Sequence, residues 1–175
     1  LNVSFPRSTG NTPCFYNHFV TDREEPFDQP GTPEEPKGHY IFDKPEPLWN
    51  FGHGKSYTTF DYVDCALSDT LLAASDTLKV SVMIKNTGRC DGKEVVQLYV
   101  RDKVSTVATP IQQLKAFQKV LIKPGESQCV ELSLPIAELA LYNAKMEEVV
   151  EPGDFEIQIG AASDDIRFKK TITIN

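Results

Sequence analysis

The chain has 175 residues, of which 40% are hydrophobic and 25% are charged, a composition typical of a globular protein. Eighteen Lys and Arg residues against 25 Asp and Glu residues give a formal net charge of −7, which argues against a nucleic-acid partner because phosphate binding needs clustered basic side chains. Apolar runs are far shorter than the roughly 20 residues that cross a bilayer, so we expect no membrane span. The chain opens on Leu1 rather than on Met, and we expect it to be a piece of a longer polypeptide.

The first third of the chain is rich in proline, with eight of the 12 prolines at or before Pro47. Between Asp22 and Pro47 there are six prolines and eleven charged residues without an apolar period, which predicts a long extended surface loop. Before this loop, Leu1, Val3 and Phe5 alternate with polar residues, which predicts one short strand without a nearby partner.

From about residue 60 the pattern changes to short runs with a period of two. Residues 78–85 alternate between apolar and polar side chains, which predicts a half-buried antiparallel strand. Residues 93–101 are apolar or aromatic on much of both faces, which predicts a central strand. Five further strands are expected at 60–67, 113–122, 129–134, 155–159 and 166–174.

The connections between these runs carry turn signals. Pro-Gly pairs at 124–125 and 152–153 separate three of the strands, and only 135–142 has helical spacing, enough for one or two turns. Seven strands in about 115 residues match the strand spacing of a two-sheet sandwich. The predicted fold is therefore all-β, an immunoglobulin-like antiparallel β-sandwich preceded by a long extended proline-rich segment.

The four cysteines are far apart, with no Cys-x-x-Cys pair and no histidine at ligand spacing, so no metal site is expected. Side chains alternate between the two faces of a strand, which places Cys65 on the inward face of its predicted strand and Cys129 on the outward face of another. This arrangement argues against a disulfide between them. Three full pairings of four cysteines are possible, and the spacing does not select among them.

Catalytic motifs are weak. A glycosidase needs two carboxyl groups about 5 to 9.5 Å apart, one of them kept protonated by burial, but the acids of the predicted strands lie at outward positions or in turns. The three histidines all lie at or before His53, and no Gly-x-Ser-x-Gly turn supplies a nucleophile. Gly52-His53-Gly54 is not followed by the residues of a phosphate-binding loop. We therefore assign no catalytic, cofactor-binding or metal-binding residue and expect no cofactor.

Aromatic residues are concentrated in the first third, where 12 of the 17 Phe, Tyr and Trp residues lie at or before Tyr62. A flat ring can stack on a sugar face, which makes Tyr40, Phe42 and Trp49 candidate sugar contacts. The simpler interpretation is that such rings anchor a segment without its own core onto the sandwich or onto a neighbouring domain.

The stretch 47–60 (Pro-Leu-Trp-Asn-Phe-Gly-His-Gly-Lys-Ser-Tyr-Thr-Thr-Phe) resembles a signature of family 3 glycoside hydrolases, Pro-Leu-Tyr-Pro-Phe-Gly-(Tyr/His)-Gly-Leu-Ser-Tyr-Thr-Thr-Phe. Trp49-Asn50 replaces Tyr-Pro and Lys55 replaces Leu. In the family, this signature joins an α/β-sandwich domain to a C-terminal fibronectin type III-like domain. Further similar stretches follow in the family's order, with Ala116 in place of a usual Gly: 3–7, 86–88, 91–100, 109–117, 121–126 and 151–155.

The resemblance covers nearly the whole chain and is closest to periplasmic β-glucosidases of Gram-negative bacteria. It implies three parts: residues 1–21 as the end of the α/β-sandwich domain, 22–59 as a proline-rich linker with the signature, and 60–175 as the fibronectin type III-like domain. The family's catalytic carboxylates belong to motifs that no position of this chain matches. We therefore expect an accessory, non-catalytic, structural part of a retaining β-glucosidase that is periplasmic or secreted.

The same resemblance implies the partners: the parent's N-terminal barrel and α/β-sandwich domains, and the parent's β-linked gluco-oligosaccharide substrate. The expected interdomain anchors are Leu48, Trp49, Phe51, Gly52, Gly54 and Tyr57, with the two glycines allowing a sharp bend. Two alternatives stay open: a carbohydrate-binding module that uses the linker aromatics, and an oligomerisation module that forms a homodimer through surfaces otherwise covered by missing domains.

Overall fold

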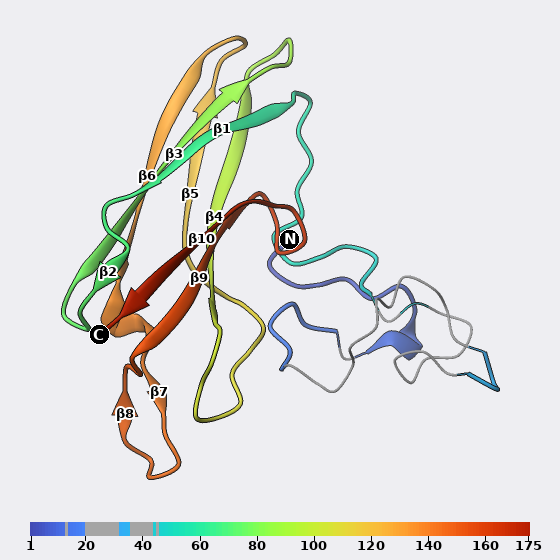
Figure 1. Ribbon diagram of the computed structural model, residues 1–175. Coiled ribbons are helices and arrows are strands. Elements are labelled where there is room, and N and C mark those ends of the chain that lie inside the picture. The colour runs from blue at the N-terminus through green and yellow to red at the C-terminus, as the bar shows by residue number, and fades with distance from the viewer. Residues whose placement is uncertain (13, 20–31, 36–43, 45) are drawn as a thin grey trace.

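The computed structural model of the chain describes residues 1–12, 14–19, 32–35, 44 and 46–175. Two of the expected sugar contacts, Tyr40 and Phe42, and most of the proline-rich segment lie outside the described residues. The described strands form two facing sheets and a small projecting hairpin (Figure 1). Their bounds are β1 Phe60–Leu67, β2 Leu71–Leu72, β3 Thr77–Asn86, β4 Gly92–Asp102, β5 Gln113–Ile122, β6 Ser127–Pro135, β7 Leu141–Tyr142, β8 Glu148–Val149, β9 Gly153–Gly160 and β10 Ile166–Ile174.

The two sheets have the orders β1-β3-β6 and β2-β10-β9-β4-β5, and β7 pairs with β8 in the hairpin. Pairing is antiparallel except between β2 and β10, which run parallel. The all-β sandwich and all seven predicted strands are confirmed, and β4 lies inside its sheet between β9 and β5, as expected from its two apolar faces.

The core lies between the two sheets and follows the alternation in the sequence. Leu78, Val80, Val82 and Ile84 of β3 are fully buried, while Lys79 and Lys85 on the other face of the strand are exposed. Val96, Leu98 and Val100 of β4 and alternate residues of β6, β9 and β10 complete the same cluster. Burial of this apolar surface is the main stabilising contribution to the fold.

The turn after β5 forms as its sequence requires. Glu126 N–H donates to the Lys123 carbonyl at 3.1 Å, with Pro124 and Gly125 at the two central positions. Gly125 has φ of +78°, a conformation that residues with a Cβ rarely adopt, so glycine fits the second central position.

Three short strands, β2, β7 and β8, have no predicted counterpart because two residues are too few to show a period. The helical spacing at 135–142 corresponds to one 3₁₀ turn, η2 Ile136–Leu139. A second short turn, η1, covers Thr9–Asn11, and within the described part of the chain no helix is long and apolar enough to span a membrane.

The short strand expected at Leu1–Phe5 is wrong as a strand, because only one isolated bridge forms there, between Phe5 and Trp49. The partner stretch turns at Phe51–Gly52, which stops the ladder from growing. In Figure 1 the N-terminus lies beside the loop that joins β9 to β10, and the described residues before β1 run next to the five-stranded sheet rather than into it.

Candidate docking site of the N-terminal segments

Two stretches of the first third of the chain meet on the outer face of the five-stranded sheet. The rings of Tyr16 and Phe51 are stacked, with centroids 4.1 Å apart and an interplanar angle of 16°. The Tyr16 ring also makes an edge contact with Tyr99 of β4 at 5.8 Å, and the Leu114 N–H of β5 donates to the Tyr16 hydroxyl at 3.2 Å. These contacts join a residue before the proline-rich segment, a residue after it and the sheet.

A buried amide connects this ring cluster to the backbone. The Tyr99 hydroxyl donates to Gln97 Oε1 at 2.6 Å, while Gln97 Nε2 donates to the carbonyls of Ala161 and, at 3.4 Å, Gly52. Gln97 is 3% exposed and Tyr99 is fully buried. Burial raises the pKa of Tyr99, so its hydroxyl stays protonated and keeps its role as donor.

The linker backbone can approach Gln97 only because residue 52 is glycine. Gly52 has φ of +83°, and a Cβ at this position would overlap the Gln97 side-chain amide. Gly54, two residues later, has a different environment, with nothing within 4 Å of the position a Cβ would take. The structure therefore favours glycine at residue 52 for two independent reasons, the positive φ and the contact with Gln97, and neither reason applies at residue 54.

The loop between β9 and β10 holds the linker from the other side. The Ser163 N–H donates to the Phe51 carbonyl at 2.9 Å, and Asn50 Nδ2 donates to the Asp164 carboxylate at 2.8 Å. Gln112, a buried residue next to β5, donates through Nε2 to the Ser163 carbonyl at 3.0 Å, which fixes this loop in turn. The linker is therefore held by directed hydrogen bonds on two sides.

The N-terminal residues pair with the linker as an irregular ribbon. The Leu1 amino group donates to the His53 carbonyl at 2.6 Å, Gly52 N–H donates to the Leu1 carbonyl at 2.8 Å, and Phe5 N–H donates to the Trp49 carbonyl at 2.7 Å. This ribbon carries an open apolar groove of about 430 Å³, lined by Leu1, Phe5, Trp49, His53, Gly54 and Lys55.

Trp49 lies in this groove with neighbours against its ring. The His53 ring is 4.5 Å away in a tilted arrangement, and the Lys55 ammonium lies 5.2 Å from the indole centroid. Trp49 is 37% exposed, so part of its ring is accessible.

A second set of hydrogen bonds, centred on Asn86, holds the chain against the sandwich just before β1. Asn86 at the end of β3 is fully buried, and its Nδ2 donates to the carbonyls of Cys90 at 2.9 Å and Ile122 at 2.8 Å. Its Oδ1 accepts a hydrogen bond from the Thr58 hydroxyl at 2.6 Å. The Asn-Thr-Gly stretch thus attaches the end of the linker to the sandwich.

The structure places the six expected anchors in three different settings. Phe51 and Gly52 contact the sandwich directly, Trp49 and Gly54 lie in the groove, and Leu48 is 46% exposed. Tyr57 is fully exposed and packs against nothing in the described chain, although its carbonyl lies 3.2 Å from the Cys90 Sγ.

The residues that carry most of the docking site were not predicted. The sequence predicts Gln97 and Tyr99 only as strand residues, Asn86 only as part of the Asn-Thr-Gly stretch that follows a strand, and Tyr16 only as part of residues 1–21. A signal for two of them was present, because Gln97 and Tyr99 lie on the second face of β4, which a two-sheet sandwich alone would leave open to solvent.

Titratable side chains elsewhere in the described residues include a partly buried carboxylate and four cysteines. Glu94 of β4, a partly buried carboxylate, accepts a hydrogen bond from the Tyr62 hydroxyl at 3.0 Å, and burial raises its pKa. No group of three possible metal ligands occurs among the residues that the structure describes. All four cysteines are free, with Cys65 buried and Cys129 exposed, as their strand parity predicted.

Comparison with known proteins identifies the sandwich. Residues 94–163 match the fibronectin type III-like domain family. The sandwich is a fibronectin type III-like domain. A β-xylosidase of Formosa agariphila is 41% identical over 95% of this chain, which spans 22% of that protein, and a periplasmic β-glucosidase of Salmonella typhimurium is 37% identical over 93% of this chain and 21% of its own length.

A solved structure gives the same result. The β-glucosidase from Listeria innocua in complex with glucose superposes on the whole chain with a TM-score of 0.85 at 34% identity, covering 24% of that enzyme. The chain thus spans about a fifth to a quarter of the relatives it matches. The chain therefore corresponds to one part of these longer proteins, and that part includes the fibronectin type III-like sandwich.

Proposed function

We propose that this chain is the C-terminal accessory region of a retaining β-glucosidase of glycoside hydrolase family 3, where it holds the parent's domains together and performs no catalysis itself. The observation that carries this proposal is the docking of residues on both sides of the proline-rich segment onto one sheet face, through Tyr16, Phe51 and Gln97. Such docking fixes where the chain enters the sandwich and therefore how a preceding domain sits.

The proposed division of the chain keeps residues 1–21 as the end of the parent's α/β-sandwich domain, 22–59 as the linker and 60–175 as the fibronectin type III-like domain. The start of β1 at Phe60 supports the second boundary. The partners are then the parent's barrel and α/β-sandwich domains.

The distribution of exposed apolar residues supports such an interface. Eight of the 15 large hydrophobic residues that are exposed lie among the described residues up to 57, and seven lie in the much longer stretch 58–175. Leu1, Val3, Phe5, Leu48 and Trp49 belong to one ribbon. An exposed apolar surface of this kind is typical of a contact with another domain.

The parent's substrate in this proposal is a β-linked gluco-oligosaccharide, and its compartment is the periplasm or the extracellular medium. Both rest on relatives, one of which is named a periplasmic β-glucosidase. An assay of the complete polypeptide with 4-nitrophenyl β-D-glucoside, with the anomer of the product followed by NMR, should give hydrolysis with retention. Inversion or failure to cleave would reject the assignment.

The structural role is tested with Phe5→Ser, made both in this chain and in the complete polypeptide. Phe5 is half exposed here, so the isolated chain should keep its melting temperature, whereas the complete polypeptide should lose several degrees if a neighbouring domain covers the ribbon. Val104→Ser is the matched control, because Val104 is exposed on a loop of the sandwich. Equal effects of Phe5→Ser in the two proteins would contradict the interdomain role.

Carbohydrate binding at the groove is a second candidate function. It is favoured by the accessible part of the Trp49 ring and by His53 Nε2, which is buried beside that ring and has no hydrogen-bond partner among the described residues. Titration with cello- and laminari-oligosaccharides should change the fluorescence of Trp49, the chain's single tryptophan, and Trp49→Phe should abolish the saturable response. No saturable response would reject this function.

Oligomerisation, the other alternative, is tested by light scattering of the isolated chain. A concentration-dependent increase from one chain to two would indicate that the exposed ribbon pairs with a second copy. A mass of one chain at all concentrations would reject the homodimer.

A further inference from the structure

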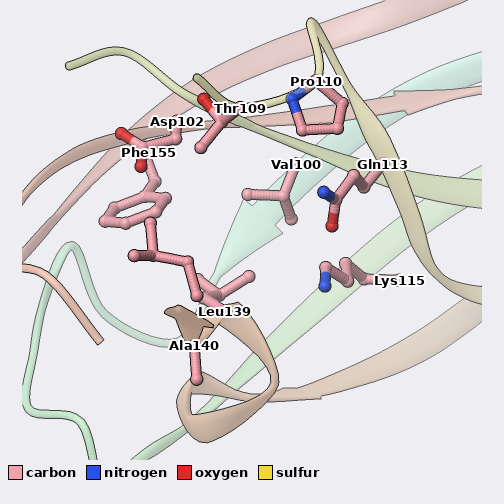
Figure 2. Close-up of a pocket in the computed structure, with 10 residues that line it drawn as sticks. Val100, Asp102, Thr109, Pro110, Gln113, Lys115, Leu139, Ala140 and Phe155 are labelled. Carbon is pink, nitrogen blue, oxygen red and sulfur yellow. The ribbon is translucent and has the colours of Figure 1, made fainter. Parts of the chain in front are cut away.

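A second hollow lies at the end of the sandwich, away from the ribbon groove. It has a volume of about 50 Å³, and its walls come from the ends of β4 and β5, the loop between them, β9 and the end of η2 (Figure 2). A water molecule needs roughly 10–15 Å³ of such space, so several non-hydrogen atoms fit.

The polar side chains of this pocket have unused hydrogen-bonding capacity. Lys115 Nζ donates to the Glu138 carbonyl at 2.7 Å, which leaves two of its three N–H groups. No hydrogen bond within the described residues uses the Gln113 amide or the Thr109 hydroxyl. Because all three groups line the hollow, they can bind an incoming polar molecule.

The charges of the pocket favour a neutral molecule. Lys115 supplies one cation, and Asp102, whose Oδ1 accepts a hydrogen bond from the Val104 N–H at 3.2 Å, supplies one carboxyl group. In Figure 2 Lys115 and Gln113 lie on one side of Val100, and Asp102 lies on the other. An anion would be attracted by Lys115 but repelled by Asp102, and a cation would meet the reverse, so a single charge gains little here. A hydroxyl group, in contrast, can donate to Asp102 and accept from Lys115.

Burial at this site strengthens these contacts. Desolvation by partial burial lowers the pKa of Lys115 and raises the pKa of Asp102, so both groups are partly shielded from water. Val100, Leu139 and Phe155 are almost completely buried and form the apolar part of the wall. A ligand therefore needs hydroxyl groups on one side and C–H groups on the other.

We propose that this pocket binds a small neutral polyol or one hydroxyl-bearing edge of a sugar, through Thr109, Gln113 and Lys115. The proposal uses none of the residues of the docking site or of the Trp49 groove. It holds or fails separately from the role proposed for the complete protein.

The test is an NMR titration of the ¹⁵N-labelled chain with glycerol, D-glucose and D-xylose. We expect saturable shifts of backbone amides in 100–102, 113–115 and 139–141 with at least one of the three. Thr109→Val and Gln113→Leu should each weaken binding about fivefold, because each removes one hydrogen bond. Gln118→Leu, on an exposed position of β5, is the control and should leave binding unchanged.

A further variant, Ala140→Met, fills the pocket without removing a polar group, and it should abolish the shifts while the rest of the spectrum stays that of the folded chain. The proposal is overturned if none of the three compounds gives saturable shifts at these amides. It is equally overturned if the shifts persist unchanged in Ala140→Met, or if sodium acetate or methylammonium binds there as tightly as the polyols.

Discussion

The sandwich and the N-terminal segments are stabilised in different ways. In the sandwich, alternate apolar residues of long strands fill a continuous core between two sheets. The N-terminal segments have no such core, and they are held by a ring stack, one buried amide and a few hydrogen bonds to the outer face of β4 and the loop after β9. The sandwich therefore tolerates small losses spread over many contacts, whereas the docking of the N-terminal segments depends on single residues.

Two signals distinguish the regions in solution. Trp49 lies in the N-terminal ribbon and is the only tryptophan, so its fluorescence follows docking. Circular dichroism in the far ultraviolet follows the strands. Four substitutions, each with a control, test whether the fluorescence and the dichroism can be made to change independently of each other.

The largest effect is expected for Leu98→Ala, since Leu98 is fully buried in the core. The cavity should lower the free energy of unfolding by about 2–5 kcal/mol. Both signals should shift together in urea, because docking needs an intact β4. Leu71→Ala, at an exposed position, should change the free energy by less than about 0.5 kcal/mol, and an equal loss in both variants would contradict the core assignment.

Gly52→Ala should move the fluorescence transition and the dichroism transition to different urea concentrations. The positive φ costs a residue with a Cβ about 1–2 kcal/mol, and the overlap with Gln97 adds to this. Trp49 fluorescence should therefore change at lower urea than the dichroism. Gly54→Ala has space for its Cβ and should leave the fluorescence transition in place, so similar curves for the two alanine variants would refute the tight approach at residue 52.

Tyr16→Phe should have a smaller effect on docking. The variant keeps the ring stack with Phe51 and loses the hydrogen bond from Leu114, which is worth about 0.5–1.5 kcal/mol. The fluorescence transition should shift slightly, with the dichroism unchanged. Tyr57→Phe removes the hydroxyl of a fully exposed residue, and a shift as large in that control would show that the Leu114 bond contributes nothing.

Glu94→Gln should have the smallest effect, and only on the sandwich. Burial raises the folded-state pKa of Glu94 above its ordinary 4.5, so the folded protein holds this proton more tightly than the unfolded chain. The associated stability is complete below the unfolded-state pKa and is lost as the pH rises through the folded-state value. The glutamine variant should lose this pH dependence while still accepting the bond from Tyr62.

Urea unfolding between about pH 4 and about pH 7 measures this effect. The stability of Glu94→Gln relative to the unmodified chain should increase across this range. Glu131→Gln, on the exposed face of β6, should follow the unmodified chain, and parallel curves for all three proteins would contradict the raised pKa.

The sequence predicts the sandwich better than it predicts the docking of the N-terminal segments, because, among the described residues, only the sandwich has a continuous core with a regular apolar pattern. A period of two located β3 to within one residue at each end, because burial on one face imposes that period. β2, β7 and β8 carry no such pattern in two residues each. The resemblance in 47–60 drew attention to Phe51 and Gly52, but it gave no indication that Tyr16 lies between Phe51 and Tyr99.

The polar part of the docking site is harder to predict for a physical reason. A glutamine such as Gln97 at an outward strand position is most often solvated, and only the arrival of Gly52 and Ala161 converts it into a buried donor. Three separate stretches of chain must be placed before its role is visible. Asn86 is a similar case, since its partners come from residues 58, 90 and 122.

The parallel pairing of β2 with β10 has a consequence for synthesis on the ribosome. Thr173 N–H donates to the Thr70 carbonyl at 2.8 Å and Asn175 N–H donates to the Leu72 carbonyl at 3.0 Å, so residues about a hundred positions apart complete one edge of the sheet. Because β10 also lies between β2 and β9, this edge cannot close until residue 175 has left the exit tunnel. During translation, β1, β3 and β6 can pair with one another first, while the nascent chain exposes the inner face that β10 later covers.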